Sequence, residues 1–228
     1  DGIRDIGVTG VQTCALPISG QGTIGLELLE EVPDLEAVVV PVGGGGLLAG
    51  VGLAIKAVRP EVRIIGVEPR RAASFAAALE AGGPVRIPVE PTLADGLAVP
   101  EVGARAFAIG RDVVDEMHAV DEESISLAIL RLAELHRGVV EGGGAATLAA
   151  FLEGRLDHLK GRSVALLLCG GNIDPMVFSR VIQHGLAVDG RLLRFTAAIR
   201  DRPGGLQHLV DRKSTRLNSS HANISYAV

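Results

Sequence analysis

The stretch Pro41-Val-Gly-Gly-Gly-Gly-Leu-Leu-Ala-Gly50 decides the fold of this chain, because four successive glycines separate an apolar strand from an apolar helix. The β-branched run at 37–42 is typical of a buried parallel strand, and 47–58 carries small and apolar residues at helical spacing. Glycine lets the backbone turn sharply and approach a ligand, and the N-terminus of the following helix adds partial positive charge. The segment therefore predicts either a site for an anion such as a phosphate or a tightly packed turn.

Two familiar phosphate-binding loops do not fit this stretch. A nucleotide-triphosphate loop needs a Lys followed by Ser or Thr after its glycines, and that pair is absent here. The dinucleotide pattern G-x-G-x-x-G is incomplete, because Leu48 stands where the third glycine is required. Glu68 nevertheless ends the next apolar run about where a ribose-binding acid would lie.

The composition is typical of a soluble α/β protein. The 228-residue chain is 47% hydrophobic, contains 30 glycines and no tryptophan, and carries a net charge of −5. Gly, Pro or charged residues interrupt every apolar run before it is long enough to span a bilayer. The central part has no basic cluster, and Cys14 and Cys169 show no disulfide or zinc spacing. These features predict a cytoplasmic protein without a membrane or nucleic-acid partner.

Strand and helix signals alternate through the middle of the chain. Strands are predicted at 37–42, 62–67 and 163–168, and helices at 47–58, 72–81, 121–137, 143–153 and 175–184. This alternation favours an α/β fold in which helices cover both faces of a parallel sheet. Ligands bind at the carboxyl ends of the strands in such sheets. The glycine loop, Glu68 and 169–174 all follow strands, so we expect them to meet at one crevice.

The two ends of the chain differ from the part between them. Residues 1–19 lack helical and strand periodicity, and 212–228 abruptly bring four serines and the only tyrosine. Both segments resemble translated sequencing-adapter DNA, with disordered natural termini as the alternative. We therefore expect both segments to pack poorly.

Six motifs, taken in order, carry a specific resemblance. They are Gly20-Gln-Gly-Thr-Ile24, the glycine loop, Ile65-Gly-Val-Glu-Pro69, Thr92-Leu-Ala-Asp-Gly-Leu-Ala-Val99, Val140-Glu-Gly-Gly-Gly-Ala145 and Cys169-Gly-Gly-Asn-Ile-Asp174. Residues 20–186 resemble the threonine ammonia-lyases (threonine or serine dehydratases), which are fold-type II pyridoxal-phosphate enzymes related to tryptophan synthase β. Residues 190–211 resemble the start of an ACT regulatory domain.

The resemblance implies a function for the intact gene product. It implies pyridoxal 5'-phosphate as cofactor and the elimination of L-threonine or L-serine to 2-oxobutanoate or pyruvate with ammonia. It also implies a homo-oligomer and an amino-acid effector at the ACT-like segment. Two alternatives stay open: another fold-type II enzyme such as a serine racemase, or a non-enzymatic module that binds a phosphate or an amino acid. The ACT-like segment favours the dehydratase, in threonine catabolism or in isoleucine biosynthesis.

The resemblance also implies roles for individual residues. Cys169 stands beside the pyridine nitrogen of the cofactor and Glu141 near its ring. A thiol is a weak hydrogen-bond partner, so the ring is a moderate electron sink, which suffices for elimination. Without the resemblance, Cys169 reads as a small apolar core residue, Glu141 as a helix N-terminal acid and Asp95-Gly96 as an ordinary turn. The implied cofactor-binding residues are Gly43, Gly44, Gly45, Gly46, Leu47, Gly96, Cys169 and Gly170.

Two parts that the family uses do not match this sequence. Glu68 and Ala72 match positions that bind a divalent cation in some relatives, but Ser74 replaces the second acid, which argues against a metal site. The Schiff-base lysine and the loop for the substrate carboxylate lie upstream of Gly20 in the family. None of the three lysines, at 56, 160 and 213, has the matching sequence context. We therefore expect the chain to be truncated and inactive by itself.

Overall fold

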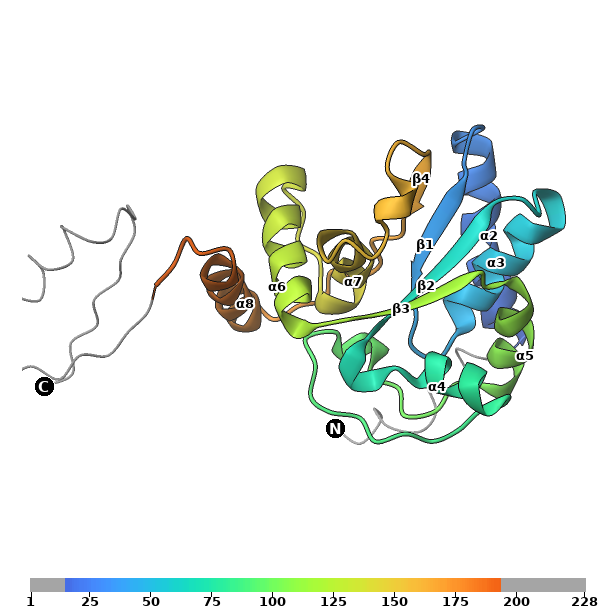
Figure 1. Ribbon diagram of the computed structural model, residues 1–228, viewed down its shortest axis with the longest axis horizontal. Coiled ribbons are helices and arrows are strands. Elements are labelled where there is room, and N and C mark those ends of the chain that lie inside the picture. The colour runs from blue at the N-terminus through green and yellow to red at the C-terminus, as the bar shows by residue number, and fades with distance from the viewer. Residues whose placement is uncertain (1–14, 194–228) are drawn as a thin grey trace, which may run out of the picture.

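A four-stranded parallel sheet forms the centre of the computed structural model, which describes residues 15–193 (Figure 1). The strands are β1 (Ala37–Pro41), β2 (Arg63–Pro69), β3 (Glu116–Val120) and β4 (Val164–Leu166), in the order β3-β2-β1-β4. Val39 of β1 lies opposite Ile65 of β2 and Leu166 of β4. The sheet confirms the predicted α/β class and places the carboxyl ends of β1 and β4 side by side.

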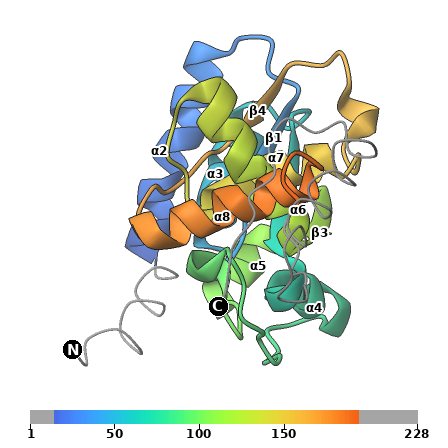
Figure 2. The same cartoon turned by 90° about the vertical axis from the view of Figure 1, so that its left-hand side faces the viewer.

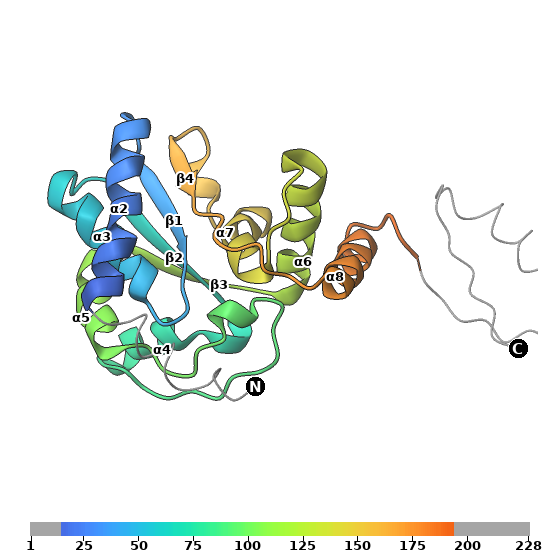
Figure 3. The ribbon, with the colours of Figure 1, turned by 180° about the vertical axis from the view of Figure 1, so that it is seen from behind.

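Helices cover both faces of the sheet, as the sequence predicts (Figures 1 and 3). The helices on one side are α2 (Ala15–Glu31), α3 (Gly46–Val58) and α5 (Ala104–Val113), and those on the other are α6 (Glu122–Arg131), α7 (Gly142–Leu152) and α8 (Pro175–Val188). Short elements complete the connections: α4 (Ser74–Ala81), η1 (Arg70–Ala72), η2 (Asp95–Leu97), η3 (Leu132–His136) and η4 (Asp157–Leu159). Figure 2 shows α8 as an outer layer over α6, with which it packs. Over residues 15–193, none of the helices has the length and apolar content needed to cross a bilayer.

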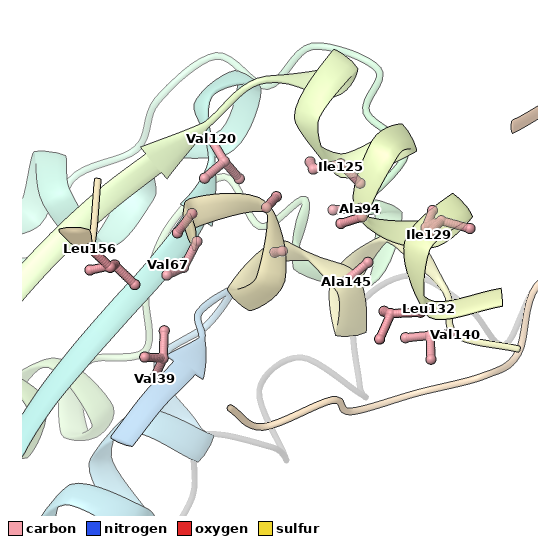
Figure 4. Close-up of a cluster of buried hydrophobic side chains, with 14 of the residues drawn as sticks. Val39, Val67, Ala94, Val120, Ile125, Ile129, Leu132, Val140, Ala145 and Leu156 are labelled. Atoms are coloured by element: carbon pink, nitrogen blue, oxygen red, sulfur yellow. The ribbon is translucent and has the colours of Figure 1, made fainter. Parts of the chain in front are cut away.

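Alternate residues of β1 point to opposite faces of the sheet, which divides the core into two clusters. Val39 packs with Val67 and with residues of α6 and α7, as Figure 4 shows. Val38 and Val40 instead pack with Leu48 and its neighbours in α3. All five side chains are fully buried. Both faces of β1 therefore require apolar residues, which explains the uninterrupted sequence Ala-Val-Val-Val-Pro.

Three main elements are absent from the sequence prediction: α2, β3 and α5. β3 reads Glu-Met-His-Ala-Val, and its polar residues do not favour a strand locally. It forms because β2 offers an open edge, where Gly66 lies opposite Met117. α5 has a local helical pattern, because its buried residues recur at helical spacing, at 106, 107, 110 and 113. Packing against an existing strand decides β3, whereas the periodicity of α5 was a signal that the sequence prediction did not use.

One helix crosses residue 19, where the sequence analysis divides the chain, and the division itself stays a prediction. α2 runs without interruption from Ala15 to Glu31, and Ile18 is 3% exposed against Ala49 and Ala106. Leu16, in contrast, is 85% exposed. The expectation of poor packing is therefore wrong for the part of 1–19 that contains Ile18. The origin of this segment in adapter DNA stays a prediction. Residues 1–14 and 194–228, with the tail and most of the ACT-like segment, lie outside the described residues.

Candidate functional site

The glycine loop connects β1 to α3 in a tight turn. β1 ends at Pro41 and α3 begins at Gly46. Gly45 is the N-cap of α3 and has a φ of 85°, a left-handed conformation that glycine adopts without strain. A Cβ atom at Gly45 would lie 3.0 Å from the Phe75 ring and 3.3 Å from the Ala106 Cβ, so the underside of the turn is closely packed. The first N–H groups of α3 have no acceptor within the helix and are available to an anion.

One cavity of about 350 Å³ brings together the residues that the sequence analysis placed near the cofactor. It lies at the carboxyl ends of β1 and β4, as expected for a parallel sheet. The predicted residues that line it are Gly43, Gly44, Gly45, Gly46, Leu47, Gly96, Glu141, Cys169 and Gly170. These residues come from segments far apart in the sequence, so the fold creates the site. Their individual binding roles stay predictions.

Cys169 follows β4 and lines this cavity with a partly buried thiol. Burial raises the pKa of the thiol above its ordinary value of 9.0, so the group is neutral at physiological pH. Cys169 also packs against the core cluster that contains Val40 and Leu48. The structure is thus compatible with both interpretations of this residue, as a small apolar group and as a neighbour of a bound ring.

Glu141 connects the N-terminus of α7 to the loop after β4. Its backbone N–H donates to the Gly170 carbonyl at 3.1 Å, and its carboxylate accepts the N–H of Asn172 at 3.1 Å. Glu141 occupies the N-cap position of α7, but its side chain makes no capping hydrogen bond. The position agrees with the interpretation as a helix-terminal acid, but the carboxylate makes its hydrogen bond outside the helix. The side chain instead fixes the segment that follows Cys169.

Gly96 lies in η2, where the Asp95 carboxylate accepts the Gly96 N–H at 2.8 Å. Asp95-Gly96 is therefore a local turn and also places Gly96 at the cavity. The sequence analysis did not assign six further lining residues: Pro17, Gln21, Pro41, Leu97, Val99 and Gly143. All of these except Pro17 belong to the quoted motifs, so a signal for them was present. Pro17 comes from the segment excluded as adapter-like, which gave no signal.

Glu68 does not line this cavity, which corrects the expectation that three strand ends meet at one crevice. Its carboxyl group is fully buried and accepts the N–H of Phe75 at 2.6 Å and of Ala76 at 3.0 Å. Ala72 is buried in η1, and the buried hydroxyl of Ser74 has no hydrogen-bond partner. In the part of the chain that the structure describes, no three His, Cys, Asp or Glu residues are placed to hold a metal ion. A divalent-cation site therefore does not fit these residues.

The environment of Glu68 predicts a pH dependence of stability. Burial raises the pKa of its carboxyl group from 4.5 to about 7, because desolvation outweighs the two hydrogen bonds from the amides of Phe75 and Ala76. The folded state therefore binds the proton more tightly than the unfolded state. The resulting stabilisation is complete below about pH 4.5 and is lost as the pH rises through about 7. We expect the free energy of unfolding to fall by about 3 kcal/mol across this window.

Urea denaturation at a series of pH values measures this change. Histidines titrate in the same range, so the comparison is with Glu68→Gln, which removes only this carboxyl group. The free energy of unfolding should fall more steeply with pH in the parent than in Glu68→Gln. This difference should account for most of the expected loss of free energy. Equal slopes for the two proteins would show that Glu68 does not titrate in this window.

Neither lysine in the described ranges reaches the cavity. Lys56 pairs with Asp115 at 2.9 Å and donates to the Pro60 carbonyl at 3.1 Å. Lys160 pairs with Asp157 at 2.9 Å, and its side chain is 74% exposed. Lys213 lies outside the described residues. Over 15–193, the lining of the cavity contains no amine that could attach a carbonyl cofactor.

Comparison with known proteins identifies the family. The sequence model of the family described as pyridoxal-phosphate dependent enzyme matches residues 8–170. The chain belongs to this family. The glycine turn at the N-terminus of α3 fits the phosphate of such a cofactor, and the neutral thiol of Cys169 fits a position beside its ring.

Curated relatives in the family include two bacterial L-threonine ammonia-lyases. That of Geobacter sulfurreducens is 47% identical over 210 residues, which cover 92% of this chain and 51% of the relative. That of Thermotoga maritima is 49% identical over 193 residues, which cover 85% of this chain and 48% of the relative. The chain thus spans about half the length of these relatives.

Solved structures in the family confirm the fold-type II architecture. The processed form of threonine deaminase isoform 2 from Solanum lycopersicum has a TM-score of 0.69 at 38% identity and covers 73% of this chain and 49% of that chain. Maize serine racemase has a TM-score of 0.67 at 36% identity, with coverages of 76% and 54%. Threonine deaminases and serine racemases thus share this half of the fold.

Proposed function

We propose that this chain is the phosphate-binding half of an ammonia-lyase that converts L-threonine to 2-oxobutanoate and ammonia, with L-serine, which gives pyruvate, as the alternative substrate. The observation that carries the proposal is the single cavity at which the glycine loop, Glu141 and Cys169 meet. The chain is 47–49% identical to two L-threonine ammonia-lyases and 36% identical to maize serine racemase. The higher identity supports elimination from threonine over racemisation of serine.

Pyridoxal phosphate supplies an electron sink for a carbanion formed at the substrate α-carbon. In our proposal the N–H groups of 43–47 bind the phosphate, assisted by the dipole of α3. Cys169 contacts the ring nitrogen as a neutral thiol, so it does not hold that nitrogen protonated as a carboxylate would. A sink of moderate strength would suffice for elimination of a β-hydroxyl group. Glu141 keeps the Cys169 segment in place through Asn172 and Gly170.

A chimera tests the proposed function. The matching half of the Geobacter sulfurreducens enzyme is replaced by residues 20–186 of this chain, and products from L-threonine and L-serine are measured. We expect 2-oxobutanoate and ammonia, with less pyruvate from serine. D-serine as the main product from L-serine would support the racemase alternative. A folded chimera that binds the cofactor but forms neither product would favour a binding module.

The isolated chain gives a second prediction. After incubation of the 228-residue chain with pyridoxal phosphate and reduction by borohydride, we expect no cofactor attached to a lysine and no ammonia release from threonine. The reason is that Lys56 and Lys160 are paired elsewhere and do not line the cavity. Peptide mass spectrometry locates any modified lysine. Specific modification of one lysine together with turnover would contradict this expectation.

Further features of the proposed enzyme rest on the sequence. An amino-acid effector bound by the ACT-like segment at 190–211 would regulate an enzyme of threonine catabolism or isoleucine biosynthesis. The mildly acidic composition favours a cytoplasmic location, and the resemblance favours a homo-oligomer.

A further inference from the structure

The buried carboxyl group of Glu68 organises the start of α4. Glu68 lies near the end of β2, and both of its oxygens accept N–H groups from the first turn of α4, those of Phe75 at 2.6 Å and Ala76 at 3.0 Å. These amides are among the groups that a helix leaves without an internal acceptor. The carboxyl group therefore fixes both the position and the direction of α4 relative to β2.

Phe75 of α4 packs against the glycine loop, so the position of α4 affects the loop. Its ring is fully buried, and it lies 5.8 Å from the Phe107 ring, measured between centroids. The space between the Phe75 ring and the loop is filled, because a Cβ atom at Gly45 would lie only 3.0 Å from the ring. A Cβ atom at Gly110 would lie 2.7 Å from the same ring. Phe75 thus supports the left-handed turn of Gly45 from below.

The divalent cation implied by the family resemblance has no suitable set of ligands here. Ser74 supplies a hydroxyl where a second carboxylate is expected, and that hydroxyl has no hydrogen-bond partner. Glu68 is therefore the one carboxylate at these matching positions, and each of its oxygens also accepts an amide of α4. Magnesium and calcium require six or more oxygen ligands, including carboxylates that balance their charge. One carboxylate and one hydroxyl do not make a site for such an ion.

We propose that Glu68 acts in place of a bound cation, as a positioning residue that holds α4 and, through Phe75, sets the conformation of the glycine loop at Gly45. The loop then needs no divalent cation to be organised. Only the cofactor-binding part of the following test rests on the proposed function.

The test uses the full 228-residue chain and the variants Glu68→Gln, Phe75→Leu and both together, above the pKa of Glu68. Gln offers one acceptor where Glu offers two, so one amide of α4 loses its partner. Glu36→Gln is the matched control, because the Glu36 carboxylate accepts the Ser163 N–H at 2.9 Å, at the opposite end of β1 from the loop. Phe75→Leu keeps the contacts of Glu68, which makes it an independent probe if Glu68→Gln does not fold.

Amide exchange reports the loop without any ligand. The N–H of Gly103 donates to the Gly44 carbonyl at 3.2 Å, and the N–H of Ala49 donates to the Gly45 carbonyl at 2.9 Å. We expect both amides to exchange roughly 3- to 10-fold faster in Glu68→Gln and in Phe75→Leu, and unchanged in Glu36→Gln. The double variant should show little more than the larger single effect, because the two residues act in series. Additive effects would overturn the proposed route through Phe75.

Two further measurements complete the test. The thermal midpoint of unfolding of the parent chain should be the same with millimolar Mg²⁺, with Ca²⁺ and with a chelator. If either cation raises this midpoint, and the rise disappears in Glu68→Gln, the proposal is overturned. The dissociation constant of pyridoxal phosphate should rise roughly 3- to 10-fold in Glu68→Gln. If the parent chain does not bind pyridoxal phosphate, exchange and the cation titration still decide the role of Glu68, and the chimera decides the proposed function.

Discussion

Replacement of Gly45 by alanine is expected to weaken the binding of pyridoxal phosphate roughly 10- to 100-fold, a larger effect than replacement of Cys169 by serine. A side chain at a φ of 85° costs roughly 1–3 kcal/mol, and its Cβ would press on the Phe75 ring at 3.0 Å. The Cβ points toward Phe75 and Ala106, away from the cavity. The substitution therefore moves the loop rather than blocking the phosphate directly.

Cys169→Ser keeps a small donor and acceptor group at the cavity, so we expect less than about a 5-fold change in the dissociation constant. Titration followed by absorbance compares the two variants with the parent sequence, each placed in the chimera that carries the lysine of the Geobacter sulfurreducens enzyme. Gly83→Ala serves as the control, because a Cβ atom there meets nothing within 4 Å. Similar losses of affinity for Gly45→Ala and Cys169→Ser would show that the phosphate does not bind at this loop.

Replacement of Gly50 by alanine is expected to destabilise the fold by about 2–4 kcal/mol. Gly50 lies where α2 and α3 approach most closely. A Cβ atom there would overlap the carbonyl oxygen of Ile18 and would lie 2.9 Å from both the Gln21 Cβ and the Gly22 nitrogen. Backbone atoms cannot rotate away as a flexible side chain can, so the two helices would have to separate.

Gly20→Ala is the matched control for this prediction. Gly20 lies in α2, and a Cβ atom there meets nothing within 4 Å. Alanine is the better helix former, so this variant should be more stable than the parent by roughly 0.5–1 kcal/mol. Chemical denaturation gives both values. If Gly50→Ala unfolds at the same denaturant concentration as the parent, the segment around Ile18 does not pack on α3, and the adapter-like interpretation of 1–19 gains support.

The sequence alone predicts the central unit of this protein correctly. β1, the glycine loop and α3 are contiguous, and their signals are local: a β-branched run, four glycines and a helical spacing of small residues. The rule that parallel strands present ligands at their carboxyl ends then predicts that Cys169 and the loop share a site, and the cavity contains both. The sequence could place Cys169 near the loop because parallel strands all end at the same edge of a sheet.

Tertiary structure alone decides which charged residues face the site. Glu68 and Glu141 are both acids near glycine-rich or helical segments, and nothing local distinguishes them. The buried carboxyl group of Glu68 accepts two amide N–H groups of α4, whereas Glu141 lines the cavity and accepts the N–H of Asn172. β3 and the packing of Ile18 depend in the same way on partners distant in sequence. Backbone propensity acts over a few residues, but the direction of a buried polar side chain is set by the hydrogen-bond donors that the fold brings to it.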